Sequence, residues 1–197
     1  MAQRSLEHRK AGIDRNKSKI NFQTVSGYAL KLRNHLLSLF GKNKVAAGKA
    51  MSWACLDMGE RKAHISEVYK HISGLNGHYN GTKLRFGGVH SLGNGVLGAA
   101  SESEITIYDS ALKSNNYDQV IEVLSHEKTH NDQLGKAKTG LPKDVVDVCD
   151  ANYVMPNESI DHYLENPVEK EARIVGQIVG AKILRDIFKS RSRQRAA

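Results

Sequence analysis

A five-residue pattern, H-E-x-x-H, most strongly constrains what this chain can fold into, and its fixed positions are His126, Glu127 and His130. Residues four apart on a helix lie on one face, with their Cβ atoms about 5–6 Å apart. Two imidazoles held in this way can reach one Zn²⁺, and the glutamate between them projects beside the metal as a general base. The pattern therefore predicts a helix with one metal-binding face, and its chemistry indicates a zinc-dependent hydrolase.

The residues around this pattern favour a helix over 117–134. Asn115 or Asn116 can cap its start, and Gly135 provides a stop after the second histidine. Apolar residues recur at helical spacing on both sides of the pattern: Val120, Ile121, Leu124 and Leu134. A helix of this kind buries one face and leaves the histidines on another.

A catalytic zinc site takes three protein ligands and leaves one position open, so a third ligand is expected elsewhere in the chain. Asn166 reads as an N-cap and Pro167 as the first residue of a helix that runs to about Lys189. Near the start of this helix, Glu169 and Glu171 are both candidates. Because two residues correspond to about 200° of rotation around a helix, only one of them can face a given metal.

An apolar stripe on the second helix favours one of these glutamates. Glu169 borders the stripe, whereas Glu171 points to the far side, which is itself apolar. We therefore predict that His126, His130 and Glu169 hold one Zn²⁺ per chain, with Glu171 as the alternative third ligand. Asn166-x-x-Glu169 is also a capping-box pattern, which would give Glu169 a structural role instead. The stripe consists of Val168, Ala172, Val175, Val179 and Ile183.

Taken together, H-E-x-x-H and the downstream Y-x-x-x-P-x-E-x-E-A (163–172) resemble the small zincin metallopeptidase domains of the gluzincin-like type. Such domains occur in bacterial toxins, secreted effectors, and phage- or plasmid-borne proteins. The resemblance covers residues 84–187. In related domains the pattern is E-x-x-A-D, with the first glutamate as ligand and the aspartate supporting a ligand histidine. Arg173 replaces that aspartate here, so the support must come from elsewhere.

The resemblance implies a metallopeptidase that acts on a protein or peptide, with a bacterial secreted effector or toxin as its setting. Glu127 would take a proton from the attacking water and pass it to the leaving amine. A further donor would stabilise the oxyanion. Tyr163 and His162 are the nearest candidates for that donor, and the resemblance favours Tyr163. Asp132 and Gln133 can either support the ligands or be solvated.

Two other functions remain open at this stage. A zinc amidase that acts on peptidoglycan crosslinks would use the same site. A non-enzymatic basic protein that binds nucleic acid or another partner would need no metal. Glu127 argues against the second of these, because a merely structural zinc site needs no general base.

The order of the predicted elements indicates an α+β fold, with N-terminal helices first, then a small mixed sheet, then the two metal helices. Residues 104–108 alternate polar and apolar, as a half-buried strand does. The resemblance implies an edge strand along the substrate cleft, and this strand can hold an extended peptide there. The helices are predicted over 24–40, 44–58 and 61–72, and the strands over 83–89, 95–100 and 104–108.

The formal net charge of +8 is partly concentrated at the two ends of the chain. The basic ends can attract nucleic acid, but no zinc-finger, homeodomain or RNP pattern is present, so nucleic acid is not the expected partner. The oligomeric state is left open. We expect a basic flexible tail over 1–23, a helical N-terminal part over 24–80, a zincin-like catalytic domain over 81–188 and a basic C-terminal tail over 189–197.

Three further features bear on the cellular setting. No apolar run has membrane-spanning length. The N-terminus lacks the apolar core of a signal peptide. Cys55 and Cys149 do not form a disulfide framework. We therefore expect synthesis in the cytoplasm without a classical signal peptide, with export to a host or target cell if the protein is an effector.

Overall fold

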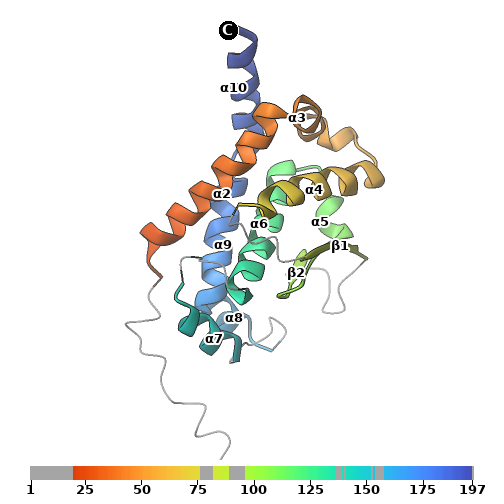
Figure 1. Cartoon of the computed structure of the whole chain (residues 1–197). Helices are drawn as coiled ribbons and strands as arrows, with labels where there is room; N and C mark the ends of the chain where they lie inside the picture. The colour runs from red at the N-terminus through yellow and green to blue at the C-terminus, as the bar shows by residue number, and fades with distance from the viewer. Residues whose placement is uncertain are drawn as a thin grey trace, which may run out of the picture.

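A computed structural model of the chain describes residues 20–75, 82–88, 96–135, 139, 141–151, 153 and 158–196. Helices dominate, and a three-stranded mixed sheet lies at one side, which confirms the predicted α+β class (Figure 1). The N-terminal helices are α2 (Phe22–Lys42), α3 (Lys44–Met51), the 3-10 turn η2 (Trp53–Cys55) and α4 (Met58–Ser73). The sheet consists of β1 (Lys83–Gly87), β2 (Gly98–Ala100) and β3 (Glu104–Tyr108).

The helices that follow the sheet include those that carry His126, Glu127, His130 and Glu169. They are α5 (Asp109–Leu112), α6 (Tyr117–Leu134), α7 (Lys143–Ala151), α8 (Ile160–Glu165), α9 (Pro167–Gly180) and α10 (Ile183–Ala196). The observed bounds of α6 are those predicted from the sequence, whereas α7 and α8 were not predicted. As expected, no helix in the described part of the chain is long and apolar enough to cross a membrane.

The N-terminal helices are separated by local capping signals. The Asn21 side chain accepts backbone N–H groups at the start of α2, so this helix begins before the predicted residue 24. Asp57 and Glu60 form a capping box that starts α4. The single helix predicted over 44–58 is wrong: α3 ends at Met51, and Leu56 is extended with ψ 140°, which frees Asp57 to cap the next helix.

The sheet has the strand order β1-β3-β2, with β1 parallel and β2 antiparallel to β3. Ile105 and Ile107 are buried and the intervening residues are partly exposed, as the alternation predicted. The expectation that residues 104–108 form an edge strand is wrong, because β3 lies in the middle. The edge strands are β1 and β2, and β2 packs against α6.

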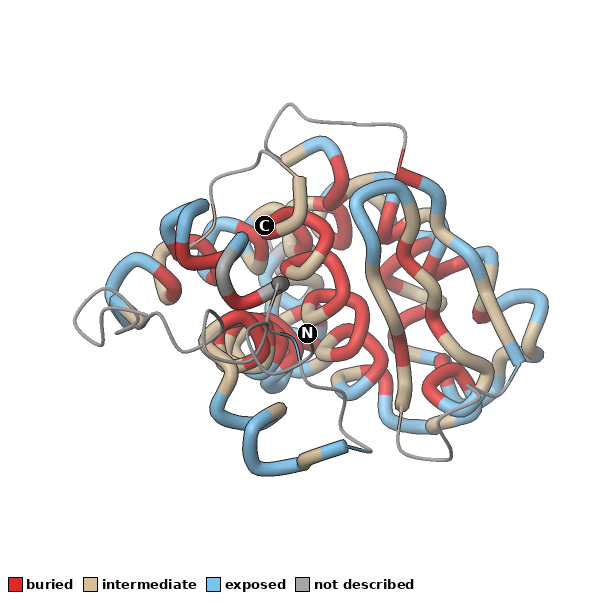
Figure 2. Tube along the Cα trace, turned by 90° about the horizontal axis from the view of Figure 1, so that it is seen from below, coloured by how far each residue is buried: buried red, intermediate tan, exposed pale blue. Residues whose placement is uncertain are grey.

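Helices α6 and α9 pack against each other, and α2 packs across α9 (Figure 1). Gly176 and Gly180 allow this close approach. A Cβ on Gly176 would lie 2.8 Å from the carbonyl oxygen of Glu122, and one on Gly180 would lie 2.7 Å from that of Asp118. One hydrophobic core includes side chains from α2, α3, α4, β3, α6, α9 and α10. The parts predicted as 24–80 and 81–188 therefore share a core, seen as the central buried helices in Figure 2.

The long helix predicted from Pro167 to Lys189 is interrupted. Lys182 has a φ of 57°, so α9 ends and α10 begins around it. The Arg33 guanidinium of α2 donates hydrogen bonds to three carbonyls at the end of α9 and pairs with Asp186 at 2.6 Å. These bonds satisfy carbonyls that lack helical partners, which stabilises the break.

The two predicted basic tails differ in what the structure describes. Helix α10 extends to Ala196, so residues 189–196 are helical rather than an irregular tail, and α10 projects beyond α2 and α3 in Figure 1. Residues 1–19 lie outside the described part of the chain. Phe22 and Gln23, which were placed in the N-terminal tail, belong to α2.

Candidate metal centre

Helix α6 presents both histidines of the H-E-x-x-H pattern on one face. It is capped by Asn116, whose side chain accepts the N–H of Gln119, and it ends at Gly135. Asn115, the other candidate cap, instead accepts a hydrogen bond from Arg61. The local signals around the pattern therefore gave the correct bounds of the helix.

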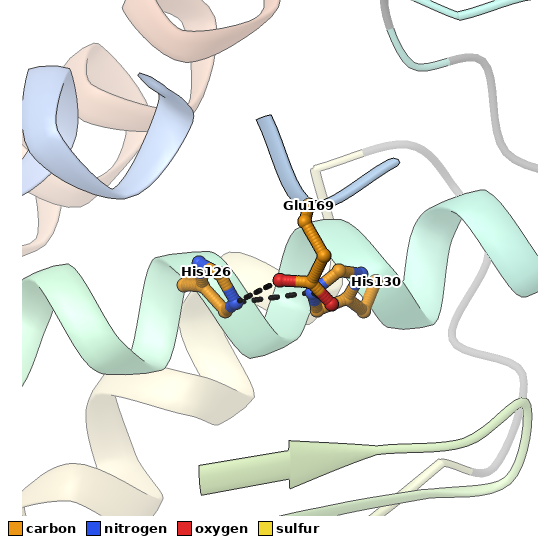
Figure 3. Close-up of side chains that lie close together, drawn as sticks. All are labelled: His126, His130 and Glu169. Atoms are coloured by element: carbon orange, nitrogen blue, oxygen red, sulfur yellow. Dashed lines mark hydrogen bonds and ion pairs between the residues drawn. The ribbon is translucent and has the colours of Figure 1, made fainter. Parts of the chain in front are cut away.

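His126, His130 and Glu169 point toward one another from α6 and α9 (Figure 3). The two Nε2 atoms lie 3.0 Å apart. The Glu169 carboxylate oxygens lie 3.6 Å from Nε2 of His126 and 3.3 Å from Nε2 of His130. In a tetrahedral zinc site, ligand atoms about 2.0–2.1 Å from the metal are roughly 3.3–3.5 Å from each other. The three side chains thus have the separations of a metal-binding group.

The Glu169 carboxylate is buried, with 2% of its side-chain surface exposed. Its Oε2 atom has no hydrogen-bond partner among the described residues. Buried carboxylate oxygens are normally paired, because leaving one unsatisfied costs free energy. A cation held between Glu169 and the two histidines would satisfy this oxygen, so the residues fit a metal ion.

The structure brings Glu169, and not Glu171, to the histidines. Asn166 caps α9 by accepting the N–H of Val168, while the Glu169 side chain faces α6. Glu171 is fully buried and accepts a hydrogen bond from Gln133 at 2.8 Å. Glu169, the glutamate that borders the apolar stripe, is thus the one that lies beside the two histidines.

Gln133 connects Glu171 to His130. The Nδ1–H of His130 donates to Oε1 of Gln133 at 2.9 Å, which leaves Nε2 facing the cluster. The amide nitrogen of Gln133 donates to Glu171. Because Gln133 is 2% exposed, the solvated alternative for this residue is wrong. Gln133 and Glu171 therefore orient the His130 ring through these two bonds.

Glu127 lies beside the three residues but is not part of their group. Burial raises the pKa of the Glu127 carboxyl, and the negative charge of Glu169 raises this pKa further. His126 and His130 act in the opposite direction and lower it. The carboxyl is therefore within electrostatic range of all three. Strand β2 covers it closely, since a Cβ on Gly98 would lie only 2.6 Å from Cγ of Glu127.

Two tyrosines contact the Glu169 carboxylate from the side of the chain between α7 and α9. The Tyr153 hydroxyl donates to Oε1 of Glu169 at 2.7 Å. Burial and then the charge of Glu169 raise the pKa of both Tyr153 and Tyr163. Their rings meet edge to face, with centroids 6.1 Å apart. Tyr163 thus lies at the cluster as predicted, whereas no sequence pattern pointed to Tyr153, and His162 is exposed.

The cluster is charged even without a metal. Burial would raise the pKa of Glu169, but its close contacts with His126 and His130 outweigh the effect of burial, and the pKa is lowered. Burial opposes protonation of His130, yet its bond to Glu169 gives a raised pKa. The site therefore combines a stable carboxylate with an imidazole, that of His130, that takes up a proton more readily than usual, and a divalent cation would replace this proton.

No family model, curated protein or solved structure matches this chain. The zincin resemblance therefore stays a prediction from the two motifs. The geometry by itself identifies a His-His-Glu group that can hold a metal ion, without identifying the metal.

Proposed function

We propose that the protein is a zinc-dependent metallopeptidase, with His126, His130 and Glu169 as the zinc ligands. The observation that carries the proposal is the position of Glu127, a buried carboxyl beside a His-His-Glu group and outside it. A structural zinc site is closed by four protein ligands, whereas a catalytic site keeps a position open beside a base. Among the described residues the group has three members, which favours catalysis.

Zinc, when bound, acts as a Lewis acid that polarises the scissile carbonyl and makes water more acidic. The residues of the chain perform the proton transfers. Glu127 accepts a proton from the attacking water and donates it to the leaving amine. Burial raises the pKa of Glu127, which suits a group that must both accept and release a proton near neutral pH. Tyr163, with Tyr153 beside it, donates a hydrogen bond to the developing oxyanion.

The first test is the metal content of the full chain, measured by mass spectrometry after zinc is offered and excess is removed. We expect about one zinc per chain, in line with the three-ligand group. The His126→Ala variant should lose it, while the exposed His162 provides a His162→Ala control that should keep it. A wild-type chain that retains no zinc would contradict the proposal and favour the basic binding protein.

The second test is hydrolysis of an unstructured protein and of purified peptidoglycan by the zinc-loaded chain. Replacing Glu127 by Gln removes the base but preserves the shape of the side chain. We expect the Glu127→Gln variant to keep its zinc and to lose about 10²–10⁴-fold of its rate. Cleavage of peptidoglycan crosslinks alone would favour the amidase alternative. Zinc binding without hydrolysis of either substrate would contradict both enzyme functions.

A further inference from the structure

Arg173 stands out because, among the described residues, a buried nitrogen of its guanidinium has no hydrogen-bond partner. This nitrogen is Nη2. Within the same part of the chain, no ion pair or hydrogen bond of this guanidinium is found, although the side chain as a whole is partly exposed. A guanidinium normally pairs with carboxylates or carbonyls when it leaves water, because an unsatisfied charged donor is costly.

The position of Arg173 relates it to the candidate metal centre. It follows Glu169 by four residues on α9, so the two side chains leave the same face about one turn apart. The charge of Arg173 also acts on Tyr163. Burial and Glu169 raise the pKa of Tyr163, and Arg173 partly offsets this by lowering it. Tyr163 in turn contacts Glu169. The guanidinium is therefore close enough to Tyr163 to act on its hydroxyl, and it leaves the helix face that carries Glu169.

We propose that Arg173 binds a carboxylate of the substrate, next to the bond that is cleaved. This inference rests on the proposed peptidase function and names the class of substrate: a peptide with a carboxylate about one residue from the scissile bond. One helical turn separates Arg173 from Glu169, and consecutive Cα atoms of a peptide are about 3.8 Å apart, so a carboxylate at that spacing can reach the guanidinium.

The chemistry of the guanidinium supports a carboxylate ligand. Its planar array of donors matches the two oxygens of a carboxylate, and such charge-assisted bonds are stronger than neutral ones. The His130 ring is oriented by Gln133 and Glu171, and Arg173 takes no part in these bonds.

Two kinds of peptide carry a carboxylate at this distance. A free C-terminal carboxylate would make the protein a carboxypeptidase, and an acidic side chain next to the scissile bond would make it an endopeptidase. Three matched probes separate them: N-acetyl-Ala-Ala-Phe-Ala as the free acid, the same peptide as its C-terminal amide, and N-acetyl-Ala-Ala-Phe-Glu as an amide. Binding is measured by NMR titration, which detects millimolar dissociation constants, on the full-length Glu127→Gln chain with and without zinc.

We expect one or both carboxylate-bearing peptides to bind roughly 10- to 100-fold more tightly than the neutral amide. The Arg173→Met variant should bind all three equally, and Arg173→Lys should retain part of the preference, because lysine keeps the charge without the fork of donors. If only the free acid binds more tightly, the carboxylate that Arg173 binds is the C-terminal one. If only the Glu peptide binds more tightly, the carboxylate is that of an acidic side chain. Equal binding of the three peptides, or no binding of any, would overturn the inference.

The design separates this inference from the proposed function. Binding is measured without hydrolysis, so an Arg173-dependent preference stands even if the chain with Glu127 intact cleaves nothing. Conversely, zinc-dependent cleavage with no carboxylate preference would leave the peptidase function in place and remove only the role of Arg173. The Arg173→Lys variant guards against a loss of binding that merely reflects misfolding.

Discussion

Helix α6 contributes to two clusters of buried polar side chains, and the two clusters differ in how completely their polar atoms are paired. On one face, Lys128, Asp132 and Tyr28 are nearly fully buried and pair among themselves. The Lys128 ammonium contacts Asp132, and the Tyr28 hydroxyl of α2 donates to the same carboxylate at 2.6 Å. On the other face, His126, His130 and Glu169 converge, yet a buried oxygen of Glu169 has no hydrogen-bond partner among the described residues.

This difference indicates different roles for the two clusters. A buried polar network with complete pairing stabilises one arrangement of the fold, and here it attaches the N-terminal helix α2 to α6. A buried cluster with an unsatisfied oxygen stores free energy that a ligand can release. Asp132 and Gln133 illustrate the contrast, because they are adjacent in sequence but belong to the closed and the open cluster, respectively.

The largest expected effect on stability comes from opening the closed cluster. Replacing Lys128 by Met leaves Asp132 buried without its cation and should lower the free energy of unfolding by about 3–5 kcal/mol. Urea denaturation measures this change. The double variant Lys128→Met/Asp132→Asn should recover much of the loss, because no buried charge remains. Zinc stoichiometry should be unchanged in the folded variants, and its loss would contradict the separation of the two faces.

His64 sharpens the comparison, because its buried Nδ1 also lacks a hydrogen-bond partner among the described residues, yet its ring packs against Trp53 and Tyr117 and it is not part of the His-His-Glu group. Burial, with a smaller contribution from Lys49, lowers its pKa to about 4. The unfolded chain therefore takes up a proton more readily. The contribution of neutral His64 to the free energy of unfolding is fully present above about pH 6.5. It decreases as the pH falls, and roughly 3 kcal/mol of it is lost by pH 4.

Comparing unfolding at pH 7 and pH 4 in the wild type and His64→Gln measures this contribution. Glutamine retains a polar group toward Tyr117, which contacts His64 at 2.9 Å, but it does not titrate. Between pH 7 and pH 4, the free energy of unfolding should fall by roughly 3 kcal/mol less in the variant than in the wild type. Equal losses in both proteins would show that an unsatisfied ring nitrogen here has no effect on the pH dependence.

A substitution at Gly98 tests whether catalysis at the His-His-Glu cluster depends on the position of Glu127. A Cβ at this residue would meet Cγ and Oε1 of Glu127 at 2.6 and 2.7 Å, so the side chain must move. We expect Gly98→Ala to lower kcat by about 10²-fold, because a base displaced by about 1 Å transfers protons poorly. Zinc content should stay the same. Gly88→Ala is the control, since its Cβ would meet nothing within 4 Å.

The smallest expected effect concerns the support of His130. Removing the Gln133 amide should weaken zinc binding by about 10–100-fold, because His130 loses the acceptor that orients its ring. Competition with a zinc-chelating dye measures the affinity of Gln133→Ala. The exposed Gln177 on α9 provides a Gln177→Ala control that should bind zinc as the wild type does. Unaltered affinity in Gln133→Ala would show that the ring needs no such support.

Sequence patterns predicted those parts of the site that depend on one or two turns of helix. The spacing of His126 and His130, the cap at Asn116 and the stripe beside Glu169 are local, and the structure agrees with each of them. The interruption at Lys182 was missed, because it depends on Arg33, which lies far away in sequence. The central place of β3 was missed because strand order depends on pairing partners and not on alternation.

By itself, the sequence determined the α+β class, the bounds of α6 and the two histidines of the candidate metal centre, and it favoured Glu169 over Glu171 as the third member. Each depends on hydrogen bonds, caps or apolar spacing within a short stretch of chain. Only the tertiary structure decided which glutamine orients His130, that Tyr153 reaches Glu169 and that Nη2 of Arg173 lacks a hydrogen-bond partner among the described residues. These contacts join residues whose distance depends on how whole helices pack, and no local pattern encodes that packing.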